Sequence, residues 1–234
     1  MTWSILARDS VTGALGVAVA TKSLAVGGIV PHGAGRLGVL ATQARFNPLY
    51  GVDGLRLLAE GRAAQEVLDI LLAADPGSSA RQVHLMDARG GVAAHTGERC
   101  EDWAGHLRGL DVSVAGNKLA GPDVARATLD SFLSSAGAPF ADRLIGALEA
   151  GEAAGGDKRG KQSAAIKIWR SEPYAVLDLR TDDHANPLQE LRRLHELAQQ
   201  RYVIAMETVS SRMNPGGLFE FSEREKFIAE RRVG

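Results

Sequence analysis

Residues 2–21 of this 234-residue chain are Thr-Trp-Ser-Ile-Leu-Ala-Arg-Asp-Ser-Val-Thr-Gly-Ala-Leu-Gly-Val-Ala-Val-Ala-Thr. Two apolar segments, residues 4–8 and 14–21, flank a turn cluster at residues 9–13 that ends in glycine. Two such segments around a short glycine-containing loop predict a β-hairpin. The rest of the chain is therefore expected to pack around a pair of antiparallel strands.

Thr2 combines a hydroxyl group with, once Met1 is removed, a free α-amino group at the head of the first predicted strand. We expect Met1 to be removed because a small residue follows it. A threonine whose own N-terminal amine serves as base is a known form of activated nucleophile. That amine has a reference pKa of about 7.7–8, close to working pH, which suits a general base. Many ordinary proteins also begin Met-Thr, so Thr2 by itself does not establish catalysis.

Composition excludes several classes of protein. The net charge of −1 and the sequence pI of about 6.6 show no basic excess of the kind that binds nucleic acid or membrane surfaces. No apolar run reaches the roughly 18 residues that a membrane-spanning helix needs, and no secretory leader is recognisable. Cys100 is the only cysteine, which excludes an intramolecular disulfide and a thiolate zinc cluster. We therefore expect a cytoplasmic protein without nucleic-acid or membrane partners.

Periodicity divides the first three quarters of the chain into alternating blocks. Strands are predicted at residues 4–8, 14–21, 36–43, 81–87, 92–96, 111–115, 162–170 and 174–179, and helices at residues 52–74 (with a break at Gly61), 123–135 and 140–151. Residues 47–51 are expected to form a turn. Pairs of helices between antiparallel hairpins predict a layered α+β domain and not a regular βαβ alternation.

The C-terminal part differs in character. Residues 186–204 and 221–232 show helical patterns, with the loop Asn214-Pro215-Gly216-Gly217 between them. We expect residues 1–183 to form the main domain and residues 184–234 a helical C-terminal extension. The amphipathic helix favours a subunit contact, and hence a homo-oligomer. The alternative is that it covers the sheet of its own chain.

Common cofactor and metal motifs are not supported. Residues 33–38 match G-x-G-x-x-G, but a β-like segment follows where a dinucleotide site requires a helix. Thr21-Lys22-Ser23 resembles the end of a P-loop without its preceding glycine. The six histidines lack ligand spacing, Thr181-Asp182-Asp183-His184 is expected to be a solvated turn, and no G-x-S-x-G elbow is present. We therefore expect no metal and no cofactor.

Residues 155–163 form a distinct loop sequence, Gly-Gly-Asp-Lys-Arg-Gly-Lys-Gln-Ser. It places three glycines, one acidic residue and three cations immediately before a predicted strand. Backbone amides in such a loop can bind an anion, with help from the cations. The alternative is a flexible surface loop.

Several segments together resemble the DUF1028 family, which is placed in the N-terminal nucleophile (Ntn) hydrolase superfamily. They are Thr2-Trp3-Ser4-Ile5-Leu6-Ala7-Arg8-Asp9, Gly16-Val17-Ala18-Val19-Ala20-Thr21-Lys22, Ala41-Thr42-Gln43-Ala44 with Asn47 and Tyr50-Gly51, Thr96-Gly97-Glu98-Arg99-Cys100 with Asp102-Trp103-Ala104-Gly105, Gly116-Asn117, and residues 155–163. The resemblance spans residues 2 to about 170. It implies a four-layer αββα sandwich, with two antiparallel sheets between helical layers.

The resemblance also implies roles for individual residues. Thr2 would attack an amide carbonyl, with its own amine as base, and Lys22 would tune that amine by its charge. Donors to an oxyanion would come from Thr42, Gln43 and Asn117. The N-terminus would be oriented by Asp157 and Ser163. The substrate-binding set implied by these motifs is Thr42, Gln43, Asn47, Lys158, Arg159 and Ser163.

Two hypotheses follow. The first is an Ntn-type amidohydrolase that cleaves a small amide, a C–N bond other than a peptide bond. Its cations Lys22, Arg45, Lys158 and Arg159 indicate an acidic group on a small-molecule substrate. The second is a non-catalytic small-molecule-binding or assembly protein on the same scaffold, because a retained Met1 would block the amine and a fold can persist without its chemistry.

Overall fold

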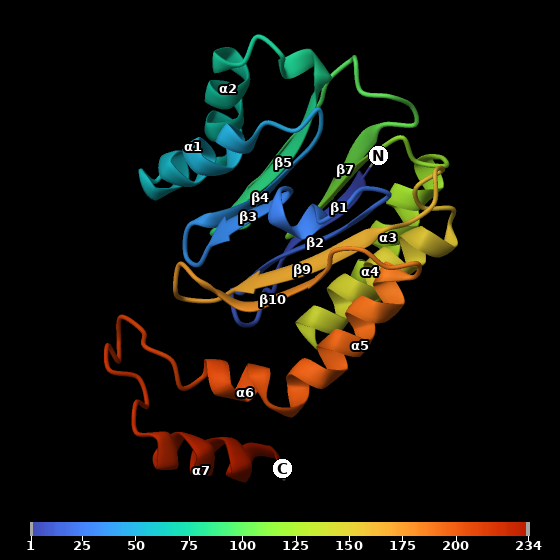
Figure 1. Cartoon of the computed structure of the whole chain (residues 1–234). Helices are drawn as coiled ribbons and strands as arrows, with labels where there is room; N and C mark the ends of the chain where they lie inside the picture. Colours follow the sequence, from blue (N-terminus) through green and yellow to red (C-terminus); the bar gives the residue numbers. More distant parts are fainter. Residues whose placement is uncertain (1, 233–234) are drawn as a thin grey trace. The chain divides into compact units, whose positions relative to one another are not determined.

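The structure is a computed structural model that describes residues 2–232 (Figure 1). The chain divides into two compact units, Met1–Leu191 and Arg192–Gly234. The first unit contains both sheets and the helices that pack on them.

The larger sheet has six antiparallel strands in the order β10-β9-β2-β1-β8-β7. Its strands are β1 (Thr2–Arg8), β2 (Leu15–Thr21), β7 (Gly105–Gly109), β8 (Val112–Asn117), β9 (Ser163–Trp169) and β10 (Ala175–Thr181). The predicted hairpin of β1 and β2 lies at the centre of this sheet, which explains why both strands are almost wholly buried.

The smaller sheet has four antiparallel strands in the order β3-β4-β5-β6. They are β3 (Pro31–Ala34), β4 (Gly38–Ala44), β5 (Arg81–Asp87) and β6 (Val92–Thr96), and short 3-10 turns η1 (Val26–Gly28) and η2 (Ser78–Ala80) precede β3 and β5. The two sheets pack face to face, chiefly through β1, β2 and β8 of one sheet against β4 and β5 of the other.

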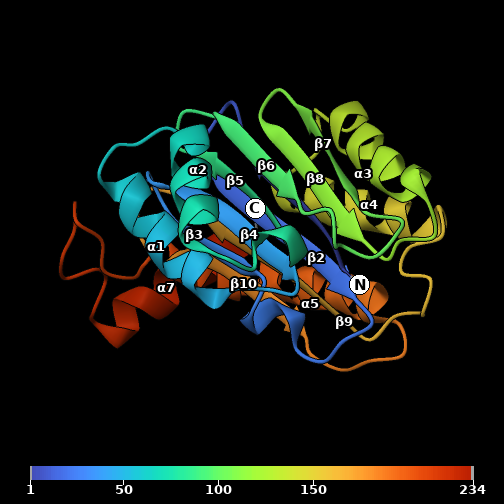
Figure 2. The same cartoon turned by 90° about the horizontal axis from the view of Figure 1, so that it is seen from above.

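Helices cover the outer face of each sheet. The helices α1 (Pro48–Ala59) and α2 (Ala64–Ala74) lie on the smaller sheet, and α3 (Pro122–Ser134) and α4 (Phe140–Ala153) lie on the larger one (Figures 1 and 2). The first unit is therefore an α+β sandwich of two antiparallel sheets between two helical layers. The expected fold class is confirmed.

Alternate side chains of β1 face two different core layers, one under the helices α3 and α4 and one between the two sheets. Trp3 and Ile5 point toward the layer of α3 and α4, whereas Leu6 joins the apolar core between the sheets. That core continues with Val17, Val39 and other residues of β2, β4, β5 and β9. Thr2 and Ser4 share the inter-sheet face with Leu6, so this interface is polar at one end and apolar at the other.

The helix α1 begins earlier than the sequence indicated. Residues 47–51 were expected to be a turn, but Asn47 caps the helix by accepting a hydrogen bond from the Leu49 N–H, and Pro48 occupies its first position. Asparagine followed by proline is a helix-start signal as well as a turn signal. Gly51 lets α1 approach β3, because a Cβ at that position would lie 2.3 Å from the His32 ring.

Two short strands were also missed. Pro31–Ala34 and Gly105–Gly109 contain glycine and histidine and lack a strong alternation of apolar side chains. They are strands because neighbouring strands supply their hydrogen-bond partners, which is a tertiary effect.

The second unit is described from residue 192 to residue 232. It contains the C-terminal part of α5 (Pro187–Gln200), then α6 (Tyr202–Met206) and α7 (Phe221–Arg232). The predicted single helix at 186–204 is thus interrupted at Arg201, whose guanidinium pairs with Glu225 of α7 at 2.6 and 2.9 Å. No helix among residues 2–232 has the length and apolar character needed to cross a lipid bilayer.

Candidate active site

Thr2 begins the central strand of the larger sheet, between two strands that carry polar side chains at the same level. In the strand register it pairs with Thr21 of β2 on one side and with Asn117 of β8 on the other. The Thr2 side of this sheet faces the smaller sheet. The Thr2 and Thr21 hydroxyl oxygens are 3.1 Å apart, and only 8% of the surface of Thr2 is exposed.

Two glutamines of the smaller sheet connect Thr2 to Asn117. The Gln43 amide donates to Gln82 Oε1 at 2.8 Å and to the Ala115 carbonyl at 3.2 Å, with a longer contact of 3.4 Å to the Thr2 carbonyl. Asn117 Nδ2 donates to the same Gln82 oxygen at 2.9 Å. Both glutamines are almost completely buried, so these contacts lie in a region of low dielectric where hydrogen bonds are strong.

A second row of polar side chains lies one step deeper between the sheets. The Ser4 hydroxyl donates to Gln43 Oε1 at 2.8 Å and lies 2.9 Å from His84 Nε2. The other ring nitrogen of His84, Nδ1, lies 2.9 Å from the Ser113 hydroxyl. Ser4, His84 and Ser113 are fully buried.

These contacts fix the tautomer of His84. Ser4 has a single hydroxyl proton, which it gives to Gln43, so it must accept a proton from His84 Nε2. Nδ1 is then the unprotonated nitrogen and accepts from Ser113. The proton order thus runs from Ser113 through His84 and Ser4 to Gln43, in one direction.

Burial keeps this histidine neutral. Desolvation, with a smaller contribution from the nearby His106, lowers the pKa of His84 to about 3. His84 therefore acts as a fixed hydrogen-bond donor and acceptor at neutral pH. Because every polar group in this row has a partner, the network holds the residues around Thr2 without leaving a buried polar group unsatisfied.

Asp157 organises the segment that follows Thr21. Its buried carboxylate accepts from the Lys22 backbone N–H at 2.8 Å and from the Arg159 backbone N–H at 2.8 Å, and it pairs with the Arg159 guanidinium at 3.1 Å. The Ser163 hydroxyl donates to the Ser23 carbonyl at 2.5 Å and accepts from Val26. Asp157 and Ser163 thus fix the segment after β2.

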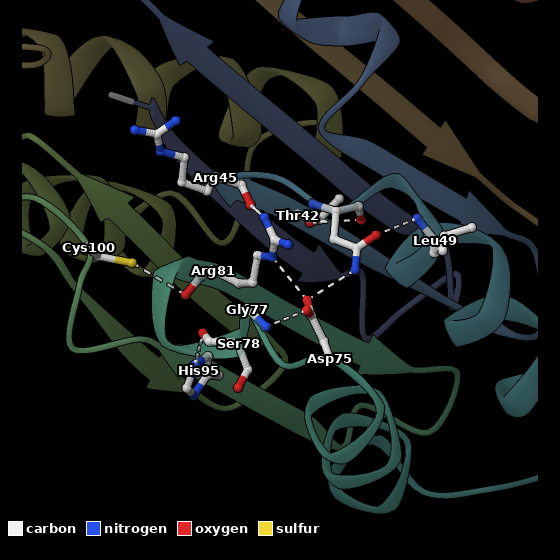
Figure 3. A network of polar contacts seen from close by, with 10 residues as sticks. Thr42, Arg45, Leu49, Asp75, Gly77, Ser78, Arg81, His95 and Cys100 are labelled. Atoms are coloured by element: carbon white, nitrogen blue, oxygen red, sulfur yellow. Dashed lines mark hydrogen bonds and ion pairs between the residues drawn. The ribbon is translucent and has the colours of Figure 1, made fainter.

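A separate polar network lies at the end of β4 (Figure 3). The Thr42 hydroxyl bonds to the backbone of Asn47, and Asn47 Nδ2 donates to Asp75 at 3.1 Å. Arg81 Nε donates to the same carboxylate at 2.9 Å, and its Nη1 donates to the Arg45 carbonyl at 2.5 Å. The Arg81 guanidinium holds the pKa of Asp75 well below its usual range.

A family model described as a family of unknown function (DUF1028) matches residues 2–191 of the chain. The chain belongs to the DUF1028 family. The crystal structure of protein SPO2555 from Silicibacter pomeroyi, a DUF1028 protein, is 33% identical and has a TM-score of 0.85; the match covers 92% of this chain and 97% of that chain.

A second solved structure, Anbu (ancestral beta-subunit) from Yersinia bercovieri, is 12% identical over 84% of this chain and 97% of its own. Its TM-score is 0.39, which is too low to carry an argument. The chain matched no curated protein.

The structure of this DUF1028 chain brings together some of the residues that the sequence singled out. Gln43 and Asn117 lie in the network around Thr2. Thr42 and Asn47 do not, because successive residues of a strand face opposite sides and Thr42 faces away from the larger sheet. Among the residues from 2 to 232, no hydrogen bond joins Thr42 or Asn47 to Thr2.

Sequence reasoning missed the residues that complete the network. They are Ser4, Thr21, Gln82, His84 and Ser113. The available signal was polar residues at alternate positions of otherwise apolar strands, such as Gln82 and His84. Within the described residues, no three His, Cys, Asp or Glu side chains form a group that could hold a metal ion.

Proposed function

We propose that this protein is an Ntn-type amidohydrolase that uses Thr2 as its nucleophile to cleave a small amide. The observation that supports this function most directly is the position of Thr2, at the head of a central strand and within a buried polar network. A fold of two antiparallel sheets between helical layers is consistent with the same mechanism. Met1 lies outside the described residues, and the mechanism requires its removal.

In this mechanism the Thr2 α-amine takes the proton of the Thr2 hydroxyl as Oγ1 adds to the amide carbonyl carbon. The resulting oxyanion collapses, the C–N bond breaks, and the leaving nitrogen takes the proton from the α-ammonium group. An ester on Thr2 Oγ1 remains. Water then adds to this ester with the amine as base, which releases the acid and restores Thr2.

Asn117 is the best-placed oxyanion donor. One of its two amide protons goes to Gln82 Oε1, and the other has no partner among residues 2–232. Asn117 lies directly across from Thr2 in the strand register, and its backbone position is fixed by the sheet. A preorganised donor of this kind contributes strongly to acyl transfer, because it need not reorient as charge develops.

The test combines intact mass with covalent labelling. Purified protein is expected to lack Met1, and a β-lactone is expected to acylate Thr2 Oγ1 with ring opening. Thr2→Ser should retain labelling and Thr2→Ala should lose it. Thr12→Ala is the matched control, because Thr12 is an exposed threonine in the turn at the far end of the same hairpin. Peptide mapping locates the label.

Two results would contradict this function. The first is a mass that retains Met1, because the amine would then be acylated and unable to act as base. The second is equal labelling of the wild-type protein and Thr2→Ala. Either result favours the non-catalytic binding or assembly role on the same scaffold.

A further inference from the structure

Three of the four cations that indicated an acidic substrate are engaged with the protein itself. Lys22 Nζ donates to the Lys161 carbonyl at 3.2 Å, and Lys158 Nζ donates to the Asp102 carbonyl at 2.8 Å. Arg159 pairs with the buried carboxylate of Asp157. Arg45 differs, because its guanidinium has no hydrogen bond or ion pair with any residue from 2 to 232, and the side chain is exposed.

The backbone of Arg45 is nevertheless held firmly. Arg81 donates to the Arg45 carbonyl, and Asp75 fixes the Arg81 guanidinium from the other side (Figure 3). The Arg45 N–H donates to the Ala80 carbonyl at 3.3 Å. In Figure 3 the Arg45 side chain points away from this network.

Backbone strain accompanies this arrangement. Ala44, which joins Gln43 to Arg45, has a φ of +65°, a left-handed conformation that costs a non-glycine residue about 1–3 kcal/mol. Such a conformation persists only when its surroundings enforce it, as the Arg81 and Asp75 contacts do here. This conformation lies at the last residue of β4, and Arg45, which follows it, is exposed.

Arg45 is close in sequence to a residue that contacts the proposed nucleophile. It follows two residues after Gln43, whose amide contacts the Thr2 carbonyl. Lys118, and more weakly Arg45, lower the pKa of Glu101, so Arg45 is within electrostatic reach of the Lys118–Glu101 ion pair. Lys118 directly follows Asn117, the register partner of Thr2.

We propose that Arg45 is a specificity-determining residue that binds a carboxylate on the substrate, so that the substrate class is an amide bearing a carboxylate group. The planar guanidinium fork matches a carboxylate in bidentate geometry, and its rigid backbone support reduces the entropy lost on binding. The Asp75–Arg81 pair positions Arg45 and does not touch the substrate. This inference rests on the proposed function of Thr2.

The first experiment compares labelling by a β-lactone that carries a free carboxylate with labelling by its methyl ester. The readout is the ratio of the two second-order rates for each variant. The wild-type protein is expected to react with the acid about tenfold faster than with the ester, or more, because one charge-assisted bidentate contact contributes that much binding free energy. Arg45→Gln should bring the ratio close to one, and Arg45→Lys should give an intermediate ratio because it keeps the charge without the fork.

Arg36→Gln is the matched control, because Arg36 is an exposed arginine at the other end of β4. Its acid-to-ester ratio is expected to equal that of the wild-type protein. An unchanged ratio in Arg45→Gln, or an equal loss in Arg36→Gln, overturns the assignment of Arg45.

The second experiment does not depend on the nucleophile. Glutarate binding to Thr2→Ala protein is measured by titration calorimetry, with dimethyl glutarate as the neutral probe, and the measurement is repeated on Thr2→Ala/Arg45→Gln. Two results together support the carboxylate site even if Thr2 proves unreactive. Thr2→Ala protein should bind glutarate more tightly than dimethyl glutarate, and the double variant should bind glutarate at least tenfold more weakly. Equal affinities in the two proteins refute it, whatever the labelling shows.

Discussion

Replacing His84 with glutamine tests whether the buried histidine is neutral and held in a single tautomer. Burial lowers its pKa to about 3 in the folded protein, whereas an unfolded chain has a histidine pKa of about 6.5. The folded-state pKa is depressed, so the unfolded chain binds more protons between these two values. The contribution of His84 to stability is therefore fully present above about pH 6.5 and is lost as the pH falls toward 3.

The magnitude follows from proton linkage. Between pH 7 and pH 5 the unfolded chain takes up most of one proton at His84, while the folded chain takes up almost none. The free energy of unfolding is expected to fall by about 2 kcal/mol from this residue alone. Glutamine does not titrate, so His84→Gln should lack this component, although it should be less stable at pH 7 by about 1–3 kcal/mol because the Ser113 hydroxyl loses its acceptor.

The assay is urea unfolding of wild-type and variant protein at pH 7 and pH 5, followed by tryptophan fluorescence. From pH 7 to pH 5 the free energy of unfolding of the wild-type protein should fall by about 2 kcal/mol more than that of the variant. Since both proteins share all other titrating groups, the difference isolates His84. A difference that stays constant between pH 7 and pH 5 would refute the reasoning. So would a long-range ¹H–¹⁵N spectrum in which Nδ1, and not Nε2, carries the proton at neutral pH.

Three further predictions concern packing and charge. Gly35→Ala should lower the free energy of unfolding by about 1–3 kcal/mol or more, because its Cβ would lie 2.1 and 2.3 Å from two backbone carbonyl oxygens. The control Gly137→Ala should change the free energy of unfolding little, because the space around Gly137 is open. Equal effects of the two substitutions in urea unfolding would contradict this prediction. Asp75→Asn should cost about 1–3 kcal/mol at pH 7 in urea unfolding. Because the pKa of Asp75 is depressed, that deficit should narrow below about pH 4, and a pH-independent deficit would exclude the ion pair as its cause. Arg201→Ala should lower the free energy of unfolding of the second unit, measured by thermal unfolding, by less than about 1 kcal/mol, because the Arg201–Glu225 ion pair is partly exposed to solvent. A larger loss would contradict its interpretation as a surface ion pair.

The sequence predicted the layered α+β class because its evidence is local. The alternation along residues 2–21, the helical period near residues 52–74 and the glycine-rich turns each follow from neighbouring residues. The short strands Pro31–Ala34 and Gly105–Gly109 were missed because their own side chains favour no strand, and partners far along the chain stabilise them.

The candidate site, too, was predicted only in part from the sequence. Thr2 was identified because its chemistry is a property of one residue at one position. Gln82, His84 and Ser113 were not, because a buried polar residue in an apolar strand does not reveal which distant side chain it contacts. The order of protons from Ser113 through His84 and Ser4 to Gln43 depends on four strands from two sheets. The subunit contact and the domain boundary at residue 183 stay predictions.

The sequence by itself determined the central hairpin, the layered class and the nucleophile candidate, since each depends on local periodicity or on the chemistry of a single residue. Tertiary structure alone decided which polar side chains surround Thr2. It also decided that, of the four cations Lys22, Arg45, Lys158 and Arg159, Arg45 is the one without a side-chain partner among residues 2–232. The physical reason is that hydrogen bonds and ion pairs are short-ranged in space while their members are far apart in the chain. Only the packing of one sheet on the other brings Ser4 within about 3 Å of both Gln43 and His84.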